Sequence, residues 1–310
     1  MNKQSTLILI VLAFPIFAAF AQNSDRLNKK IIELDKFDRP IREEIIYSIS
    51  LSYQNGISRK ITLFDEKKKP ISTEIYFNES SKAELGVERE KHIFNKRGKK
   101  KKLEKIHTRA ESQFTGIQKT FFYYNSKGYN TKIEFLYTIR KQQSSGHVKL
   151  IKYYSKKGVV FKNETVFMPN REKKHEQYSA IRYFNSKGKV FKKEAVYANK
   201  RDNDLGYYRA VHFYDSSGKV QKEEWYFTDL NQLKEHVTKI VFFYGKKGEK
   251  IKHESILTPD KAREVGYDKK VYFYNPSGRA IRFEKYKIFN DQDGTQTLIG
   301  TTYLKEEPKD

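Results

Sequence analysis

The motif that organises this chain is FYDSSGKVQKEE, which spans Phe213–Glu224. Its core is an aromatic residue, then Asn, Asp, Ser or Gly, then two further residues and a glycine. The glycine returns with a period of 30, and a glutamate follows it six positions later. The glycines are Gly98, Gly128, Gly158, Gly188, Gly218, Gly248 and Gly278. The glutamates are Glu104, Glu134, Glu164, Glu194, Glu224, Glu254 and Glu284, and the same phase extends back to Glu74 and Glu44. A fixed period of this length indicates a repeat architecture.

Each unit contains two β-prone runs around a tight turn. Tyr207–Tyr214 is rich in aromatic and β-branched residues, and Lys219–Phe227 alternates apolar with charged residues. Such runs, bounded by Gly, Asn, Asp and Ser, predict strands. Asn275–Gly278 suits a type I turn with a left-handed glycine at its fourth position, a common hairpin closure. Each unit is therefore predicted to be a β-hairpin.

The predicted fold is all-β: an antiparallel meander of about 16–18 strands over residues 38–304, with tight turns on one side and longer connections on the other. The sheet is expected to be either open and superhelical or closed into a ring or barrel. The half-unit at each end favours closure, because Pro40–Tyr47 could pair with Thr297–Leu304 and remove both edges.

The charged positions of the repeat follow two rules. The first strand is basic nine residues before the glycine, and the second strand is basic four residues after it, beside the repeated glutamate. Alternation places a lysine and a glutamate two residues apart on one face. We interpret the nine glutamates as a structural row paired with these lysines, because a catalytic acid would be singular. The first-strand cations have no acidic partner in this interpretation.

The ends of the chain differ from the repeats. Residues 1–21 have a positive start, an apolar run and Ala19 and Ala21 before a cleavage point, which predicts a secretory signal peptide. An uncleaved anchor is the alternative, but the run is shorter than the roughly 20 residues that span a bilayer. Residues 22–37 are expected to be a polar lead-in, loose or briefly helical, and residues 305–310 a polar tail.

The chain has no cysteine, hence no disulfide and no lipid-anchor acceptor. We expect an exported protein that is not a lipoprotein, in the periplasm, secreted or at the outer surface.

No catalytic motif is present in the sequence. The seven histidines show no metal-ligand spacing, and no nucleotide-binding or hydrolase motif occurs. We therefore expect no enzyme activity, no cofactor and no metal.

The charge is strongly positive, with 62 Lys and Arg against 38 Asp and Glu. Such an excess favours polyanions or anionic membrane surfaces, or else it is a lysine coat that keeps sheet edges apart. The candidate polyanion contacts are Lys99, Lys100, Lys101, Lys102, Lys173, Lys174, Lys200 and Arg201. Nucleic acid is disfavoured, because the aromatic residues occupy strand positions and the signal peptide directs the chain outward.

The core F-Y-[ND]-x-x-G-[KR], as in Phe213–Lys219, resembles the YD repeats of the RHS family and the MORN-type hairpin repeats of bacterial proteins. Lysine- and glutamate-rich hairpins are also similar to the single-layer sheets of spirochaete outer-surface lipoproteins. The strict period and the constant glutamate depart from the YD and MORN patterns. These resemblances imply a structural or binding role.

The function expected from the sequence is an exported, non-enzymatic repeat protein. Its basic sheet surface would bind a glycan, an anionic lipid or an acidic protein. A purely structural envelope protein and an outer-membrane β-barrel pore are the alternatives. We expect neither strand face to be cleanly apolar, with Lys222 and Glu224 on one and Arg209 on the other, which argues against the pore.

Overall fold

The computed structural model describes residues 8–9, 27–168, 177–197, 200, 204–290 and 295–304. The chain divides into two compact units, unit 1 (Met1–Val159) and unit 2 (Val160–Asp310). Within each unit the strands pair antiparallel in sequence order. The all-β antiparallel meander expected from the repeat is confirmed.

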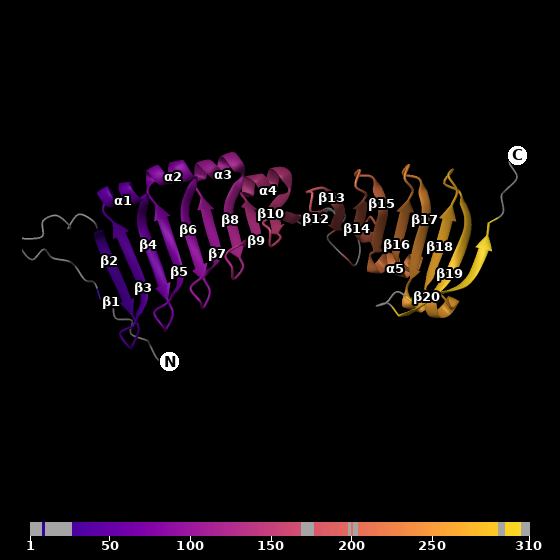
Figure 1. Cartoon of the computed structure of the whole chain (residues 1–310), viewed down its shortest axis with the longest axis horizontal. Helices are drawn as coiled ribbons and strands as arrows, with labels where there is room; N and C mark the ends of the chain where they lie inside the picture. The colour runs from indigo at the N-terminus through magenta and orange to yellow at the C-terminus, as the bar shows by residue number, and fades with distance from the viewer. Residues whose placement is uncertain are drawn as a thin grey trace, which may run out of the picture. The chain divides into compact units, whose positions relative to one another are not determined.

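Unit 1 consists of hairpins that alternate with short helices, which lie along one end of the strands while the tight turns lie along the other (Figure 1). Its strands are β1 (Ile8–Leu9), β2 (Leu27–Leu34), β3 (Pro40–Tyr47), β4 (Ile57–Phe64), β5 (Pro70–Phe77), β6 (Val87–Phe94), β7 (Lys100–His107), β8 (Ile117–Tyr124), β9 (Asn130–Tyr137) and β10 (His147–Tyr154). Its helices are α1 (Ile49–Asn55), α2 (Glu79–Leu85), α3 (Arg109–Thr115) and α4 (Ile139–Ser145).

Unit 2 repeats this arrangement and ends on a longer hairpin. Its strands are β11 (Val160–Phe167), β12 (Gln177–Phe184), β13 (Val190–Tyr197), β14 (Tyr207–Tyr214), β15 (Val220–Phe227), β16 (Val237–Tyr244), β17 (Lys250–Leu257), β18 (Lys269–Tyr274), β19 (Ala280–Asn290) and β20 (Thr295–Tyr303). Its described helices are α5 (Asp229–Glu235) and α6 (Pro259–Val265).

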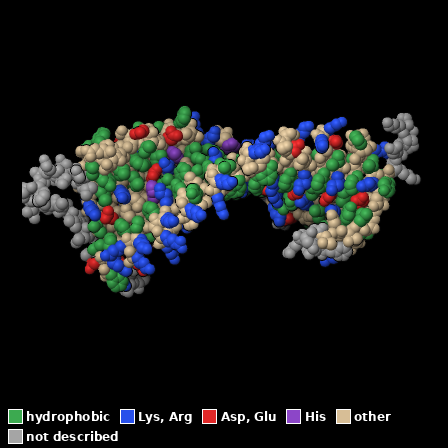
Figure 2. Space-filling model, viewed as in Figure 1, with side chains coloured by type: hydrophobic (Ala, Val, Ile, Leu, Met, Phe, Trp, Pro, Cys, Tyr) green, Lys and Arg blue, Asp and Glu red, His purple; other side chains and the backbone are tan. Residues whose placement is uncertain are grey.

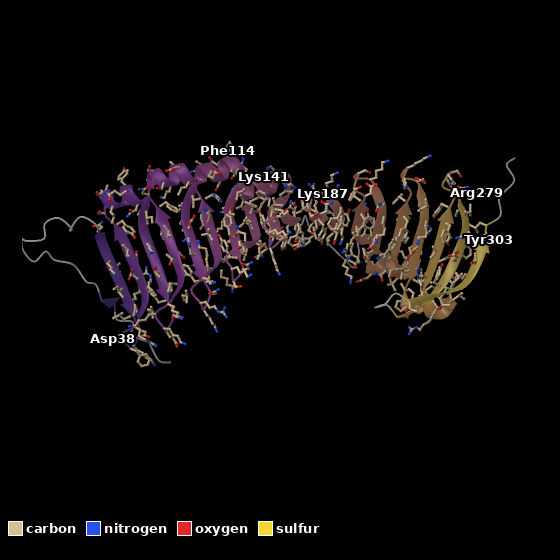
Figure 3. All side chains as sticks on the ribbon, viewed as in Figure 1. Asp38, Phe114, Lys141, Lys187, Arg279 and Tyr303 are labelled. Atoms are coloured by element: carbon tan, nitrogen blue, oxygen red, sulfur yellow. The ribbon has the colours of Figure 1, made fainter. Side chains whose placement is uncertain are left out.

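The tight turns have the geometry that the motif predicts. In the turn after β14, the amide of Gly218 donates to the carbonyl of Asp215 at 3.1 Å, and Gly218 has a φ of 88°. The Asp215 carboxylate also accepts from the amides of Ser217 and Lys219, at 2.8 and 2.9 Å. The Asx side chain thus closes the turn while the glycine takes the left-handed conformation. Asp38 and Lys68 occupy the glycine position in the first two turns with φ of 55° and 60°, and Figure 3 places Asp38 at the turn end of unit 1.

The connections contain helices of seven residues, which the sequence analysis did not anticipate. Thr108 caps α3 by accepting from the amide of Glu111, and Gly116 ends it in the left-handed conformation. The amide of Thr108 also donates to the carbonyl of Gly86, the cap that ends α2, at 3.0 Å. The caps Asn78, Thr138 and Thr258 make the same bond to the residue that ends the preceding helix. The capping residues of the described helices are Ser48, Asn78, Thr108, Thr138, Thr228 and Thr258.

Two expectations about the ends are corrected. Residues 27–34, which we expected to be part of a lead-in, form β2, because they occupy the phase of a first strand and pair with β3. The repeats therefore begin with a complete hairpin, β2–β3. The closure between Pro40–Tyr47 and Thr297–Leu304 does not occur: β3 pairs with β2 and β4, and β20 pairs with β19 in the part of the chain that the structure describes. The sheet is not closed by these strands.

Residues 1–7 and 10–26, which cover most of the expected signal peptide, and the tail at 305–310 lie outside the described residues. Ile8 and Leu9 of the expected signal segment form the two-residue strand β1 against β2.

Burial in the sheet comes from side chains that fold over a single layer of strands. Val211 is 1% exposed, although its register partners on both neighbouring strands are glutamates, Glu194 and Glu224. In the register, Lys222 and Phe213 lie two residues from Glu224 and Val211, and long side chains at such positions can cover neighbouring surface with their apolar stems. Figure 2 shows Lys and Arg side chains interleaved with hydrophobic side chains on the surface of the strands. We call the face that carries Val211 and Glu224 the ion-pair face.

Candidate functional site

The repeated glutamates form a row of ion pairs on the ion-pair face. Glu224 contacts Lys222 Nζ at 2.9 Å within its own strand and Lys239 Nζ at 3.0 Å on the next strand. Tyr226 donates its hydroxyl to the same carboxylate at 2.8 Å. Burial alone would raise the pKa of Glu224, but these hydrogen bonds lower it to about 2. The carboxylate is fixed as an anion and has no proton to exchange near neutral pH.

An ion pair recurs at every glutamate of the row. The carboxylates at Glu44, Glu74, Glu104, Glu134, Glu164, Glu194, Glu224, Glu254 and Glu284 each lie within 4.0 Å of at least one Lys or Arg nitrogen.

Among the described residues, six of the seven first-strand cations, all but Lys149, do have acidic partners, which corrects the sequence interpretation. Arg209 contacts the glutamate of the preceding hairpin, Glu194, at 2.9 Å, and Lys119 contacts Glu104 at 3.6 Å. The partners are fifteen residues apart, so the pairing appears only when the strand order is known. The same pairing occurs at Arg59, Arg89, Lys239 and Lys269. These cations are therefore engaged within the sheet.

The second-strand cations also lie over aromatic rings. Lys222 Nζ is 4.0 Å from the centroid of Phe213, and Lys252 Nζ is 4.1 Å from that of Phe243. A cation over a ring face is attracted by the ring's negative potential, typically by about 0.5–1 kcal/mol at exposed sites. Much of the positive charge on the ion-pair face is therefore in contact with a carboxylate or an aromatic ring.

The eight candidate polyanion contacts differ in how exposed they are. Lys99 and Lys101 are exposed, whereas Lys100 and Lys102 are half-buried, with Lys102 Nζ 4.4 Å from the Phe121 ring. Lys200 is exposed, with Nζ 5.4 Å from the Tyr208 ring. The other three, Lys173, Lys174 and Arg201, lie outside the described residues.

The exposed cations of unit 1 gather at the hairpin turns, a pattern that the sequence analysis missed. We define the basic turn edge as Lys67, Lys68, Lys69, Lys96, Arg97, Lys99, Lys127, Lys156 and Lys157, all of which are exposed. Two exposed acidic residues, Asp38 and Glu66, lie at turn positions of the same unit. The signal was available, because these cations recur around the turn glycine with the period of 30. Figure 2 shows Lys and Arg side chains along this end of unit 1.

Consecutive turns are also tied together. Lys99 Nζ donates to the carbonyl of Ser126 in the next turn at 3.2 Å, and Arg39 Nη1 donates to that of Glu66 at 3.3 Å. Successive turns lie two strands apart, roughly 9.5 Å. Within the described ranges, no ion pair involves Lys96, Arg97 or Lys127. The basic turn edge is therefore a regularly spaced line of cations.

The opposite end of unit 1 is more apolar. Phe114 in α3 is 89% exposed, and Figure 3 shows it at the helix end of the unit. Shallow grooves of about 560 and 490 Å³ lie on its two sides, and Arg109, Arg140 and Lys141 line the second. Among the described residues, no group of three or more His, Asp or Glu side chains could hold a metal ion, and no helix is long and apolar enough to cross a bilayer.

Comparisons with known proteins add little to this geometry. The chain matches no protein-family model and no curated protein. A solved structure described as the crystal structure of TcdB2-TccC3 is similar at 9% sequence identity and a TM-score of 0.17, covering 88% of this chain and 19% of that one. The chain thus spans about a fifth of that protein's length. At this TM-score the similarity carries no argument, and the assignment of this chain as a β-hairpin repeat protein rests on its own strands, turns and period.

Proposed function

We propose that this chain is an exported, non-enzymatic repeat protein that binds a linear polyanion along the basic turn edge of unit 1. The observation that supports this most directly is the nine exposed cations at repeated turn positions, against two exposed carboxylates, Asp38 and Glu66. Most cations on the ion-pair face are engaged by glutamates or rings, whereas the turn cations are exposed and are therefore available to a partner.

The spacing of the edge favours an extended ligand. Cations that recur roughly every 9.5 Å along a line of turns would contact a chain of anionic groups at several points. Weak contacts then add up, because each further contact is intramolecular once the first has formed. A sulfated or carboxylated glycan has this character. An acidic protein and an anionic lipid surface are the other ligands with the required charge.

The export part of the proposal rests on the sequence of residues 1–21, which has the composition of a cleaved signal peptide. The non-enzymatic part of the proposal is supported by Glu224, because a carboxylate that its partners hold as an anion is a poor general acid. A purely structural envelope role is the competing function, in which the turn lysines only keep the protein soluble.

The test compares two triple variants in one unit. Lys96→Gln, Arg97→Gln and Lys127→Gln remove cations from the basic turn edge. Arg109→Gln, Arg140→Gln and Lys141→Gln remove three exposed cations from the helix end and serve as the matched control. Retention on heparin and on phosphatidylglycerol vesicles is measured against salt, because screening weakens contacts between exposed charges.

We expect the turn variant to leave heparin at clearly lower salt than the control, with a shallower salt dependence of binding. An equal loss in both variants would mean that net charge alone drives retention. Retention of the unchanged protein no stronger than that of a basic protein of similar charge would favour the structural role. Stronger retention on vesicles than on heparin would assign the edge to lipid.

A further inference from the structure

The outermost strand of unit 2, β20, is unlike the other strands of the protein. Its sequence is TQTLIGTTY, and it is the one described strand of six or more residues without a charged side chain. Eight of its nine residues are exposed, with Leu298, Ile299 and Tyr303 at 50, 53 and 74%. Figure 3 shows Tyr303 on this strand.

The outer edge of β20 is open to pairing. In the described ranges β20 pairs with β19 alone, whereas the strand in the same phase one repeat earlier, β18, pairs with β17 and β19. A strand with one paired edge presents a row of unpaired N–H and C=O groups on the other. Proteins usually protect such an edge with lysine, proline or a very short strand. No lysine or proline occurs within Thr295–Tyr303 and the strand has nine residues, so the register shifts against β19 are its one irregularity of this protective kind.

The other end of the chain does carry such protection. The strand β2 contains Lys29, Lys30 and Glu33, and β1 pairs with it at Ile32 and Glu33. The lack of charge on β20 is therefore specific to that edge.

We propose that β20 pairs with β20 of a second copy of this chain, antiparallel about a twofold axis. The distribution of charge favours β20 of a second copy as the partner. The chain carries a net charge of +24, so most contacts between copies place like charges together. Two β20 strands meet without opposing any charged side chain, and they join the sheets at their least charged edge. A twofold contact uses the same surface on both copies, so it closes at two and forms no filament.

Dimerisation and polyanion binding respond to salt in opposite ways. Salt screens the repulsion between the two positive chains and so strengthens the dimer, whereas it weakens contacts to a polyanion. A single pair of strands is a small interface, so the association should be weak and dependent on concentration. A dimer would also carry two basic turn edges, which would increase the avidity for a long polyanion.

The experiment measures self-association of the purified chain by sedimentation over a range of concentrations. Leu298→Lys with Ile299→Lys adds two charges to the open edge. The matched control is Ile71→Lys with Ile251→Lys, which are 45 and 44% exposed on strands paired on both sides. Circular dichroism checks that both variants keep the sheet.

We expect the unchanged chain and the control to dimerise, more strongly at higher salt, and the β20 variant to lose at least tenfold in affinity. The chain has no cysteine, so single cysteines at Thr297, Ile299 and Thr301 give a second readout. At least one of them should form a disulfide-linked dimer, while cysteine at Ile251 should not. A chain that stays monomeric at all concentrations, or equal association in both lysine variants, would overturn the proposal. Heparin retention can persist in either case, so this result is separate from the proposed function.

Discussion

Arg209 in β14 donates from Nη2 to Oε2 of Glu194 in β13 at 2.9 Å, and this ion pair joins one hairpin to the next. Glu194 also contacts Lys192 Nζ at 2.6 Å, and its side chain is 6% exposed. Burial alone would raise the pKa of Glu194, but the hydrogen bonds from Lys192 and Arg209 lower it. A sheet of one layer has no enclosed core, so such pairs between neighbouring hairpins carry much of its specificity.

Replacing Arg209 by leucine should destabilise unit 2 by about 1–3 kcal/mol, because Glu194 loses a hydrogen-bonded partner while it stays buried. Lys149→Leu is the matched control. Lys149 occupies the same repeat position, but no carboxylate lies within 4.0 Å of it among the described residues. Urea unfolding monitored by circular dichroism measures both. Equal losses would show that the Arg209 pair adds nothing beyond side-chain packing.

Stability should fall in acid through Glu224 of the glutamate row. The folded pKa of Glu224 is about 2, below its ordinary value of 4.5. A lowered pKa contributes stability that is present above pH 4.5 and is lost as the pH falls towards 2. The shift corresponds to at most about 3 kcal/mol at pH 7. Glu224→Gln should therefore be less stable than the unchanged protein at pH 7, with the difference shrinking towards zero near pH 2.

Unfolding in urea at pH 7, 4 and 2.5 checks this pH dependence. Glu66→Gln, at an exposed turn position, is the control and should keep the pH dependence of the unchanged chain. A difference between Glu224→Gln and the unchanged chain that stays constant from pH 7 to 2.5 would contradict the linkage.

The strands and turns could be predicted because their signals are local and repeated. Gly218 and Asp215 specify one turn by themselves, and the period of 30 residues then gives the positions of the remaining turns. The partner of Arg209 could not be predicted in this way. Its carboxylate belongs to the preceding hairpin, and only the order of the strands brings the two residues together.

The strand β2 was missed for another reason. Lys29, Lys30 and Glu33 make Leu27–Leu34 look like a polar segment, yet in a single-layer sheet such residues are ordinary. The phase of the repeat was the better guide, since β2 lies thirty residues before β4.

Replacing Lys68 by glycine should stabilise unit 1 by up to about 1 kcal/mol. Lys68 stands where later turns have glycine, with a φ of 60°, and a side chain in this conformation is strained. The neighbouring Lys67 has no positive φ, so Lys67→Gly should instead destabilise the protein through the entropy of the unfolded chain. Thermal melts of the two variants give the comparison. A lower melting temperature for Lys68→Gly would refute the strain argument.

The helices were missed because seven residues make two turns, too few to show a 3.6-residue period. Their caps were visible, however. A Ser, Thr or Asn stands eight residues before a left-handed glycine at Ser48, Asn78, Thr108, Thr138 and Thr258. Met168 and Ala198 stand at this position in the two connections that lie largely outside the described residues.

The cap at Thr108 should matter to α3 more than its length suggests. A helix of seven residues is not stable alone, so it depends on its ends and its attachment. The Thr108 hydroxyl accepts from the amide of Glu111 at 3.3 Å, while the Thr108 amide holds the carbonyl of Gly86. Thr108→Ala removes the first contact and keeps the second, and should cost about 1 kcal/mol. Thr108→Ser keeps the accepting oxygen and should cost little.

Hydrogen exchange at the Glu111 amide measures the capping hydrogen bond directly. The exchange should become faster in Thr108→Ala and stay slow in Thr108→Ser. Equal exchange in the two variants would mean that the backbone link to Gly86, and not the hydroxyl, sets the start of the helix.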